Sequence, residues 1–175
     1  TKTSTKRFLS TLLKKVKKSL ILDADALNII SSEKKLLNLI PFNSIITPHP
    51  KEFERLVGKW KNDIKKLDLL KNFSKKYKLI CILKGANTTI AFPNGYLFFN
   101  SNGNPGMASA GSGDVLTGII GSLLAQGYSS EISSKLGVYI HGLAGDFAKS
   151  KFGETSMTAS NIQECISLAF KELLK

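Results

Sequence analysis

Short apolar runs alternate with amphipathic segments along the first half of the chain. Three runs have the length and the apolar, β-branched content of buried strands: residues 19–25, 43–50 and 78–85. Four segments repeat apolar side chains at helical spacing: residues 6–18, 31–40, 51–58 and 64–77. Buried strands that alternate with helices are typical of an α/β fold built on a parallel sheet.

The second half predicts a hairpin and then helices. Residues 87–100 contain two β-rich runs around Pro93-Asn94-Gly95, which is the pattern of a hairpin. Residues 130–150 and 158–174 have helical periodicity. We therefore expect a single α/β domain over residues 1–175, with a mostly parallel central sheet flanked by helices.

Local signals predict where two of the helices begin and end. Ser31 or Ser32 is expected to cap the helix at residues 31–40, because a serine hydroxyl accepts a hydrogen bond from the first helical turn. Gly58 is expected to end the helix at residues 51–58, since glycine tolerates the backbone conformation that follows a helix.

Composition narrows the class of protein. The 175 residues are 42% hydrophobic and 22% charged, as in a folded domain with a core. The net charge of +12 lies on helix faces without interleaved aromatic side chains, which favours a solvated basic face over a nucleic-acid surface. Cys81 and Cys165 are expected as reduced core residues. With no apolar run that spans a bilayer and no visible signal peptide, we expect a cytoplasmic protein without a membrane partner.

Polar residues follow each of the three predicted strands. They form three clusters: residues 23–28, 47–52 and 84–88. Ligands of open α/β sheets bind outside the carboxyl ends of the strands, so these clusters are candidate site residues. Taken singly, each has two interpretations. Asp23 and Asp25 either bind Mg²⁺ or cap the next helix, His49 is more often a structural loop histidine, and Lys84 either contacts a phosphate or starts a turn.

The stretch "GNPGMASAGSGDVLTGIIGSLLAQG", residues 103–127, joins a loop of small residues to an uncharged helix. Gly111, Ser112 and Gly113 allow a tight turn, and the unpaired amides of a helix N-terminus favour an anion such as phosphate. Asp114, in the first turn, suits a general base that takes a proton from an attacking hydroxyl. A helix-dipole residue after an ordinary turn is the alternative.

Two further features of the helical region are given structural interpretations. The stripe of small residues Gly118, Gly121 and Ala125 predicts close helix packing. His141 lies in an apolar helical segment and is expected in the core.

Six segments, in order and with matching spacing, resemble one family. They are "ILDADALN" (21–28), "ITPHPKEFERLVG" (46–58), "ILKGANTTIA" (82–91), residues 103–127, "HGLAGDFA" (141–148) and "MTASNI" (157–162). The chain is similar over nearly its whole length to the ADP- or ATP-dependent NAD(P)H-hydrate dehydratases, the YjeF carboxyl-terminal-type domains of the ribokinase-like superfamily. The resemblance implies a ribokinase-like fold and a lyase that restores NADH or NADPH from its hydrate, with a phosphorylated intermediate.

The resemblance also implies roles for particular residues. Asp114 matches the catalytic base at the hydrated substrate, and His49 matches a substrate contact, with Glu52 as its support or as a ligand of a metal-bound water. The resemblance assigns binding of the adenine nucleotide, ADP or ATP with Mg²⁺, to Gly113 and to one segment: Lys84, Gly85, Ala86, Asn87 and Thr88. Asn104 belongs to the Gly-Asn-x-Gly-Met run of the family. Family analogy implies a homotetramer.

The chain departs from the family pattern in two places. Only one predicted helix, residues 6–18, precedes "LDADAL", so we expect a domain truncated at its amino terminus and lacking part of the substrate wall. Asn161 stands where an acid is common, which predicts a weaker helix cap. Two alternatives therefore stay open at this point: a kinase of a small vitamin alcohol, and a non-catalytic remnant that binds a nucleotide or a partner chain.

Overall fold

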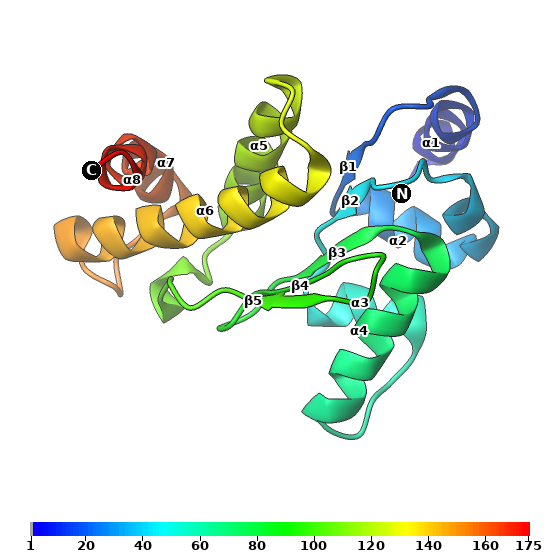
Figure 1. The fold of residues 1–175 in the computed structure, drawn as a ribbon, viewed down its shortest axis with the longest axis horizontal. Coiled ribbons are helices and arrows are strands. Elements are labelled where there is room, and N and C mark those ends of the chain that lie inside the picture. The colour runs from blue at the N-terminus through cyan, green and yellow to red at the C-terminus, as the bar shows by residue number, and fades with distance from the viewer. Residues whose placement is uncertain (1) are drawn as a thin grey trace. The chain divides into compact units, whose positions relative to one another are not determined.

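The computed structural model describes residues 2–175, which divide into two compact units. We call them the sheet unit, residues 2–85 with Thr89–Phe98, and the helical unit, Ala86–Thr88 with Phe99–Lys175. Each is described by itself below, and Figure 1 gives the element labels.

The sheet unit alternates strands and helices as the hydrophobic pattern predicts (Figure 1). In chain order its elements are α1 (Thr3–Lys15), β1 (Ile21–Leu22), α2 (Asp25–Ser32), the 3-10 helix η1 (Lys34–Leu39), β2 (Ile45–Ile46), α3 (Pro50–Val57), α4 (Asp63–Tyr77), β3 (Ile80–Leu83), β4 (Thr89–Ala91) and β5 (Leu97–Phe99), whose last residue is the first of the second segment of the helical unit. The strands form one sheet in the order β1-β2-β3-β4-β5.

The sheet is parallel from β1 to β3 and then antiparallel from β3 to β4. Ile45 of β2 faces Ile21 of β1 on one side and Ile80 of β3 on the other. The expected hairpin is present, because β4 and β5 are neighbours joined by a turn in which Gly95 has φ +87°. The predicted α/β class with a mostly parallel sheet is thus confirmed.

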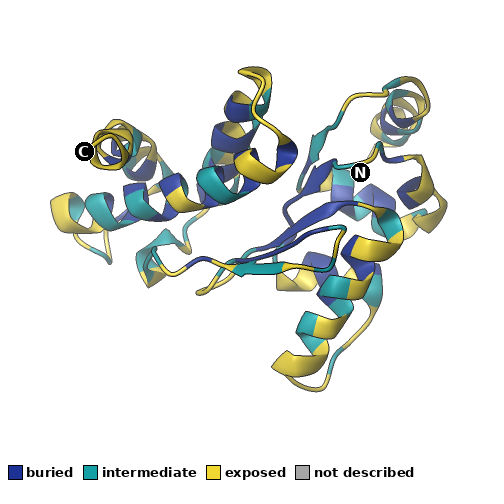
Figure 2. Cartoon of the chain, in the orientation of Figure 1, coloured by how far each residue is buried: buried dark blue, intermediate teal, exposed yellow. Residues whose placement is uncertain are grey.

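The core of the sheet unit is made of large aliphatic and aromatic side chains. Figure 2 shows the buried stretches of the strands and helices in dark blue. Alternate strand residues enter it, such as Cys81 and Leu83 of β3, because successive side chains of a strand point to opposite faces. Phe53 of α3 is fully buried and lies 5.8 Å from Phe73 of α4 and 6.0 Å from Trp60, measured between ring centroids.

Two details of the sheet unit differ from the prediction. Residues 31–40 do not form one helix: α2 already ends at Ser32, and the following residues form η1. Ser31 and Ser32 cap nothing at an N-terminus, because their hydroxyls donate to the carbonyls of Asn28 and Ile29 in the preceding turn. Gly58, with φ +93°, ends α3 as expected.

The helical unit consists of one 3-10 turn and four α-helices. They are η2 (Pro105–Met107), α5 (Ser112–Ala125), α6 (Ser130–Phe152), α7 (Ala159–Glu164) and α8 (Ile166–Leu173). The predicted helix at residues 158–174 is therefore two helices that meet at Cys165. Asn161 does not weaken its cap, because its side chain accepts from the Thr158 amide at 2.9 Å in a capping box.

Glycine sets the distance between α5 and α6. A Cβ atom on Gly137 of α6 would lie 2.5 Å from Cγ1 of Ile120, so the two helices approach where a side chain is missing. The buried cluster around them contains small or flexible side chains such as Ala144, Ala148 and Met157. Cys81 and Cys165 are both free and buried, as expected. Within residues 2–175, the structure contains no helix with the length and apolar character needed to cross a membrane.

Candidate functional site

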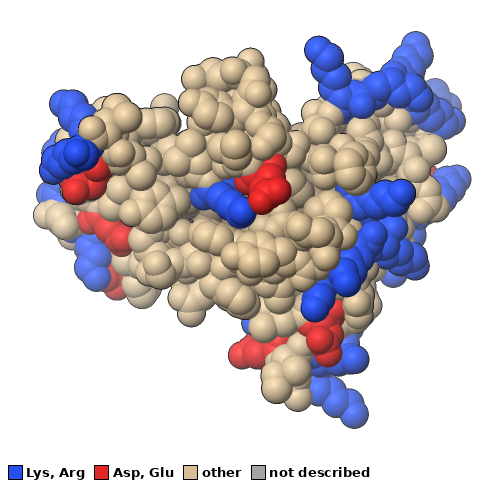
Figure 3. All heavy atoms as spheres, in the orientation of Figure 1, with Lys and Arg blue, Asp and Glu red and all other residues tan. Residues whose placement is uncertain are grey.

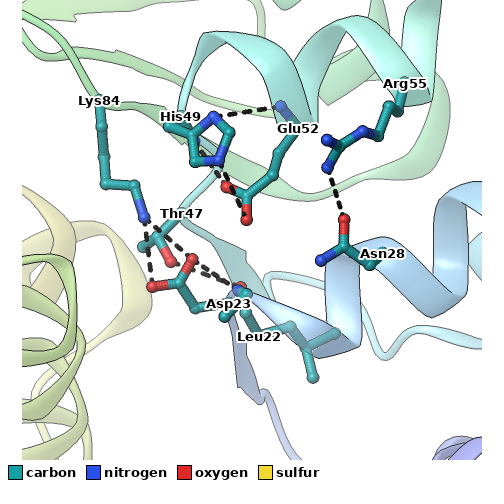
Figure 4. A network of polar contacts seen from close by, with 9 residues as sticks. Leu22, Asp23, Asn28, Thr47, His49, Glu52, Arg55 and Lys84 are labelled. Atoms are coloured by element: carbon teal, nitrogen blue, oxygen red, sulfur yellow. Dashed lines mark hydrogen bonds and ion pairs between the residues drawn. The ribbon is translucent and has the colours of Figure 1, made fainter. Parts of the chain in front are cut away.

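The carboxyl ends of β1, β2 and β3 bring together charged side chains within the sheet unit (Figure 4). Asp23 follows β1 and Lys84 follows β3, and the Lys84 ammonium nitrogen lies 3.0 Å from Oδ1 and 3.3 Å from Oδ2 of Asp23. The Lys84 amide donates to the carbonyl of Pro48, after β2, at 2.9 Å. The ion pair thus links the ends of β1 and β3 across β2, and the backbone hydrogen bond links the ends of β2 and β3.

His49 and Glu52 form a capping box at the start of α3 (Figure 4). The Glu52 amide donates to Nδ1 of His49 at 3.3 Å, and the His49 amide donates to Oε2 of Glu52 at 2.9 Å. Because Nδ1 is an acceptor, the proton of the neutral ring lies on Nε2, which is 3.5 Å from Oε1 of Glu52. Pro50 occupies the first helical turn, where its missing N–H costs no hydrogen bond.

This capping box explains much of the His-Pro-Lys-Glu spacing in structural terms. The Glu52 side chain is 6% exposed and both of its oxygens lie against His49, whereas the His49 side chain is 44% exposed. Glu52 therefore supports the ring, and His49 still presents one side of its imidazole to solvent.

The carboxylates of the sheet unit do not assemble into a metal centre. Asp23 is paired with Lys84 and Glu52 with His49, while Asp25 is the first residue of α2 and caps no helix with its side chain. Across residues 2–175 no three or more His, Cys, Asp or Glu side chains lie close enough to hold a metal ion.

A short exposed turn joins β3 to β4. Gly85, Ala86 and Asn87 are exposed, and a Cβ on Gly85 would touch no atom within 4 Å. Thr88, at the end of the turn, accepts a backbone hydrogen bond from the Asn100 amide at 2.9 Å. The predicted nucleotide segment is thus an open loop between two paired strands.

The helical unit holds the second candidate group, at the N-terminus of α5. Gly111 precedes the helix with φ +86°, a conformation that favours glycine. The Gly113 and Asp114 amides donate to no acceptor within residues 2–175, while the Ser112 amide donates to the Ser109 carbonyl at 3.3 Å. Unpaired amides at a helix N-terminus attract anions, and the exposed Asp114 side chain stands beside them.

Ser112 has a different role from its glycine neighbours. It is buried, and its hydroxyl lies 3.3 Å from Nε2 of His141 on α6. His141 is half-buried and its Nε2 faces the Ser112 hydroxyl, so it is not the fully buried core residue that was expected.

A groove of about 440 Å³ runs along α5 from Asp114. Val115, Gly118 and Ser122 form one side, and Ile166 and Phe170 of α8 form the other. A Cβ on Gly118 would meet nothing within 4 Å, so the close helix packing predicted for this glycine is absent in the described chain.

Sequence reasoning missed one polar group of the helical unit. Asp146 of α6 accepts from the Gly103 amide and from the Asn104 side-chain amide, each at 2.9 Å. Asn104 in turn accepts from the Gly106 amide at 3.1 Å and caps η2. An acid in an otherwise apolar helical segment, five residues after His141, is the sequence signal that points to this contact.

The fold is an α/β fold of the ribokinase-like kind, with polar strand ends and a glycine turn before a helix. It is similar to a ribokinase-like superfamily protein from Enterococcus faecalis, with a TM-score of 0.78 and 29% identity over 98% of this chain and 60% of that one. The model of the NAD(P)H-hydrate dehydratase family matches residues 1–168, and the chain belongs to that family.

Two further relatives share much of the chain. The bifunctional NAD(P)H-hydrate repair enzyme Nnr of Moorella thermoacetica is 38% identical over 93% of this chain and 31% of its own length. The ADP/ATP-dependent NAD(P)H-hydrate dehydratase of Bacillus subtilis, co-crystallised with ATP and Mg²⁺ and soaked with CoA, gives a TM-score of 0.78 and 26% identity over 91% of this chain and 58% of that one. The chain thus spans about a third of the curated relative and three fifths of the solved structures.

Proposed function

We propose that the chain catalyses nucleotide-dependent dehydration of (S)-NADH or NADPH hydrate and so returns the damaged cofactor to use. Membership of the dehydratase family supports the substrate. The observation that carries the chemistry is the start of α5, where the exposed Asp114 carboxylate adjoins the unpaired amides of Gly113 and Asp114.

Asp114 serves as a general base in this proposal. It takes the proton of the hydroxyl on the hydrated ring while that oxygen attacks the terminal phosphorus of ADP or ATP, and the bond from phosphorus to the leaving nucleotide breaks. The amides at the start of α5 stabilise the negative charge of the transferred group. Phosphate then leaves with the carbon–oxygen bond pair, a ring proton is lost, and the double bond returns.

The other predicted residues receive roles under the same proposal. Lys84 and the open turn Gly85–Thr88 hold the nucleotide with Gly113, and His49, supported by Glu52, contacts the hydrated substrate. Ser112 is the exception in the phosphate turn, because its hydroxyl and its amide are both engaged within the helical unit. The amides of Gly113 and Asp114 are therefore the better anion donors, with Gly111 supplying the turn.

In this proposal Mg²⁺ enters with the nucleotide and is held mainly by its phosphates, and the described residues contain no group of three or more His, Cys, Asp or Glu side chains that could hold it alone. Mg²⁺ is commonly held by one or two carboxylates together with substrate phosphates, whose charge it neutralises. A cytoplasmic location suits the free cysteines, and a homotetramer belongs to the proposal by family analogy.

The first test measures the return of NADH absorbance from hydrated NADH with Mg²⁺ and ADP or ATP. Loss of a general base lowers rates by about 10²–10⁴-fold, so we expect Asp114→Asn to reduce kcat by that factor. Asp63→Asn is the matched control, since Asp63 is also an exposed first-turn aspartate, on α4. Unchanged turnover in Asp114→Asn would remove the assigned base, and a stable phosphorylated alcohol would replace the dehydratase by a kinase.

A second test addresses Lys84 through its partner. If Lys84 contacts nucleotide phosphates, Lys84→Ala weakens nucleotide binding in calorimetry by about tenfold or more, in the range of one charged hydrogen bond. Asp23→Asn removes the partner but keeps the ammonium group, so binding stays equal or tightens. Equal losses in both variants would mean that the ion pair only holds the strand ends together.

A further inference from the structure

The Asp146 carboxylate of α6 binds the loop that precedes α5 by two hydrogen bonds. Both oxygens of Asp146 are engaged, Oδ2 by the Gly103 amide and Oδ1 by the Asn104 side-chain amide. The side-chain oxygen of Asn104, Oδ1, accepts in turn from the Gly106 amide. The chain of donors and acceptors thus runs from α6 through Asn104 into η2.

Glycines of α6 and of the loop make close contacts around this carboxylate. A Cβ on Gly145 would lie 2.2 Å from the sulfur of Met107, and one on Gly142 would lie 2.0 Å from Oδ1 of Asn102. On the other side of the loop, a Cβ on Gly106 would lie 2.5 Å from the carbonyl oxygen of Glu154. The loop thus packs closely on α6 at Gly142 and Gly145, and at Gly106 the contact is with backbone, where an added side chain would force a shift.

The same helix also holds the chain at the start of α5. The hydroxyl of Ser112 lies 3.3 Å from His141, and His141 precedes Asp146 by five residues on α6. Between these two anchors the backbone turns twice, with hydrogen bonds from Ala108 to Pro105 and from Ser112 to Ser109. Because both ends of this short segment are held by α6, a shift of Asn104 should be transmitted along the loop to Asp114.

We propose that Asp146 is a positioning residue for the reaction: it fixes Asn104 and, through the loop, the place of the Asp114 carboxylate and the adjoining amides. The inference rests on the proposed function, because the reaction it serves is the one assigned to Asp114. Asp146 itself is expected to touch neither substrate nor nucleotide.

Donor and acceptor counting shows how the idea can be tested. In Asp146→Asn, the new amide group faces the Asn104 amide, and turning Asn104 over only moves the conflict to the Gly106 amide. In Asn104→Asp, two carboxylates face each other. In the double variant Asp146→Asn with Asn104→Asp, the side chains exchange roles, and the Gly103 and Gly106 amides again have acceptors. The exchanged pair satisfies every donor of the original one.

The experiment compares the two single variants with the exchanged pair. Each single variant loses a charge-assisted hydrogen bond, so we expect kcat to fall by about tenfold or more while KM changes less. The exchanged pair should recover kcat to within about threefold of the parent, in line with a restored bond. Ser150→Ala is the control on the same helix, since the exposed Ser150 hydroxyl donates to the backbone carbonyl of Asp146. Single variants with parental kcat, or an exchanged pair as slow as they are, would overturn the proposal.

Amide chemical shifts in NMR spectra separate this proposal from the dehydratase assignment. Positioning predicts that Asp146→Asn shifts the amide signals of Gly113 and Asp114 as well as those of Gly103 and Gly106, and that the exchanged pair returns the signals of Gly113 and Asp114. This readout needs no turnover, so a parent chain without activity would overturn the proposed function alone. Shifts that end at Gly106 would overturn the positioning role, whatever the activity.

Discussion

The two units of the chain differ in charge and in how they are packed. The sheet unit holds 20 Lys or Arg against 7 Asp or Glu, a net charge of +13, whereas the helical unit holds 5 against 6, a net charge of −1. Figure 3 shows basic side chains gathered over the surface that α1 and α4 occupy in Figure 1. The core of the sheet unit is filled almost throughout by large side chains, whereas the core of the helical unit mixes Ile, Leu and Met with Ala144, Ala148 and Ala169, and α5 and α6 approach closely at Gly137.

The difference extends to the candidate chemistry. In the sheet unit, polar function is carried by long side chains at strand ends, which pair with each other as Lys84 does with Asp23. In the helical unit the Asp114 carboxylate stands beside backbone amides, and close approach at Gly106, Gly142 and Gly145 shapes the loop that leads to α5. One unit should therefore be sensitive to lost side-chain volume and the other to added volume.

The largest effect is expected from lost volume in the sheet unit. Phe53→Ala removes a fully buried ring that contacts Trp60 and Phe73, and such truncations cost about 3–5 kcal/mol of unfolding free energy. Urea unfolding followed by fluorescence reports this unit, since Trp60 is the only tryptophan of the sequence. Phe42→Ala is the control, because the Phe42 side chain is 60% exposed, and it should change stability by less than about 0.5 kcal/mol. A loss below about 1 kcal/mol in Phe53→Ala would contradict the contrast in packing.

Added volume should discriminate between two glycines of the helical unit. Gly137→Ala and Gly118→Ala both gain about 1 kcal/mol of helix propensity, but only the new Cβ at position 137 meets a neighbour, Cγ1 of Ile120 at 2.5 Å. The difference between the two variants isolates that clash, for which we expect about 1–3 kcal/mol. Hydrogen exchange of the α5 and α6 amides measures it. Equal stability of the two variants would show that Ile120 yields without cost.

The contrast also explains which structural predictions succeeded. Strands β1 to β3 and helices α3 and α4 follow from hydrophobic spacing, because each has a clear apolar pattern and, in α3, a glycine stop. The structure of residues 31–40 was not predicted correctly, since the Ser31 and Ser32 hydroxyls donate to the preceding turn instead of capping the next helix. A serine hydroxyl can do either, and the choice depends on tertiary contacts that a local pattern does not contain.

The candidate site was predictable where chemistry lies in side chains. The polar strand ends and Asp114 follow from position in the sequence, and the ion pair of Asp23 with Lys84 confirms that two of the polar clusters meet. Asp146 was missed because its partners, Gly103 and Asn104, lie more than forty residues away in the chain and bond through groups that leave no sequence pattern. The family resemblance supplied the Gly-Asn-x-Gly-Met run but no reason for it.

His49 offers a way to separate capping from substrate contact. His49→Ala removes the side-chain cap of α3 and should cost about 1 kcal/mol, whereas serine at the same position is a good cap and should preserve stability. If the imidazole contacts the hydrated substrate, both variants raise KM for it. Thr158→Ala removes the cap of α7 in the helical unit and serves as the control, with a similar loss of stability and an unchanged KM. If KM for the hydrated substrate is the same in His49→Ser as in the parent, His49 caps α3 but does not contact the substrate.

The smallest expected effect is a difference in alkaline stability between the two buried thiols. Burial raises the pKa of Cys81, so folding disfavours its thiolate, and the unfolding free energy should fall as the pH rises above the titration of the unfolded thiol near pH 8.5. Between about pH 7.5 and pH 9, this one group accounts for about 0.8 kcal/mol. Urea unfolding at the two pH values measures it, and Cys81→Ala should flatten the decline by that amount.

Cys165 completes the comparison from the helical unit. Burial raises its pKa as well, but the ammonium of Lys151 opposes the rise and the carboxylate of Glu164 supports it. Because the cation favours the thiolate, Cys165→Ala should flatten the alkaline decline less than Cys81→Ala does. An equal or larger effect at Cys165 would mean that Lys151 and Glu164 together give the thiolate no net support. The different charge of the two units would then have no influence on the two thiols.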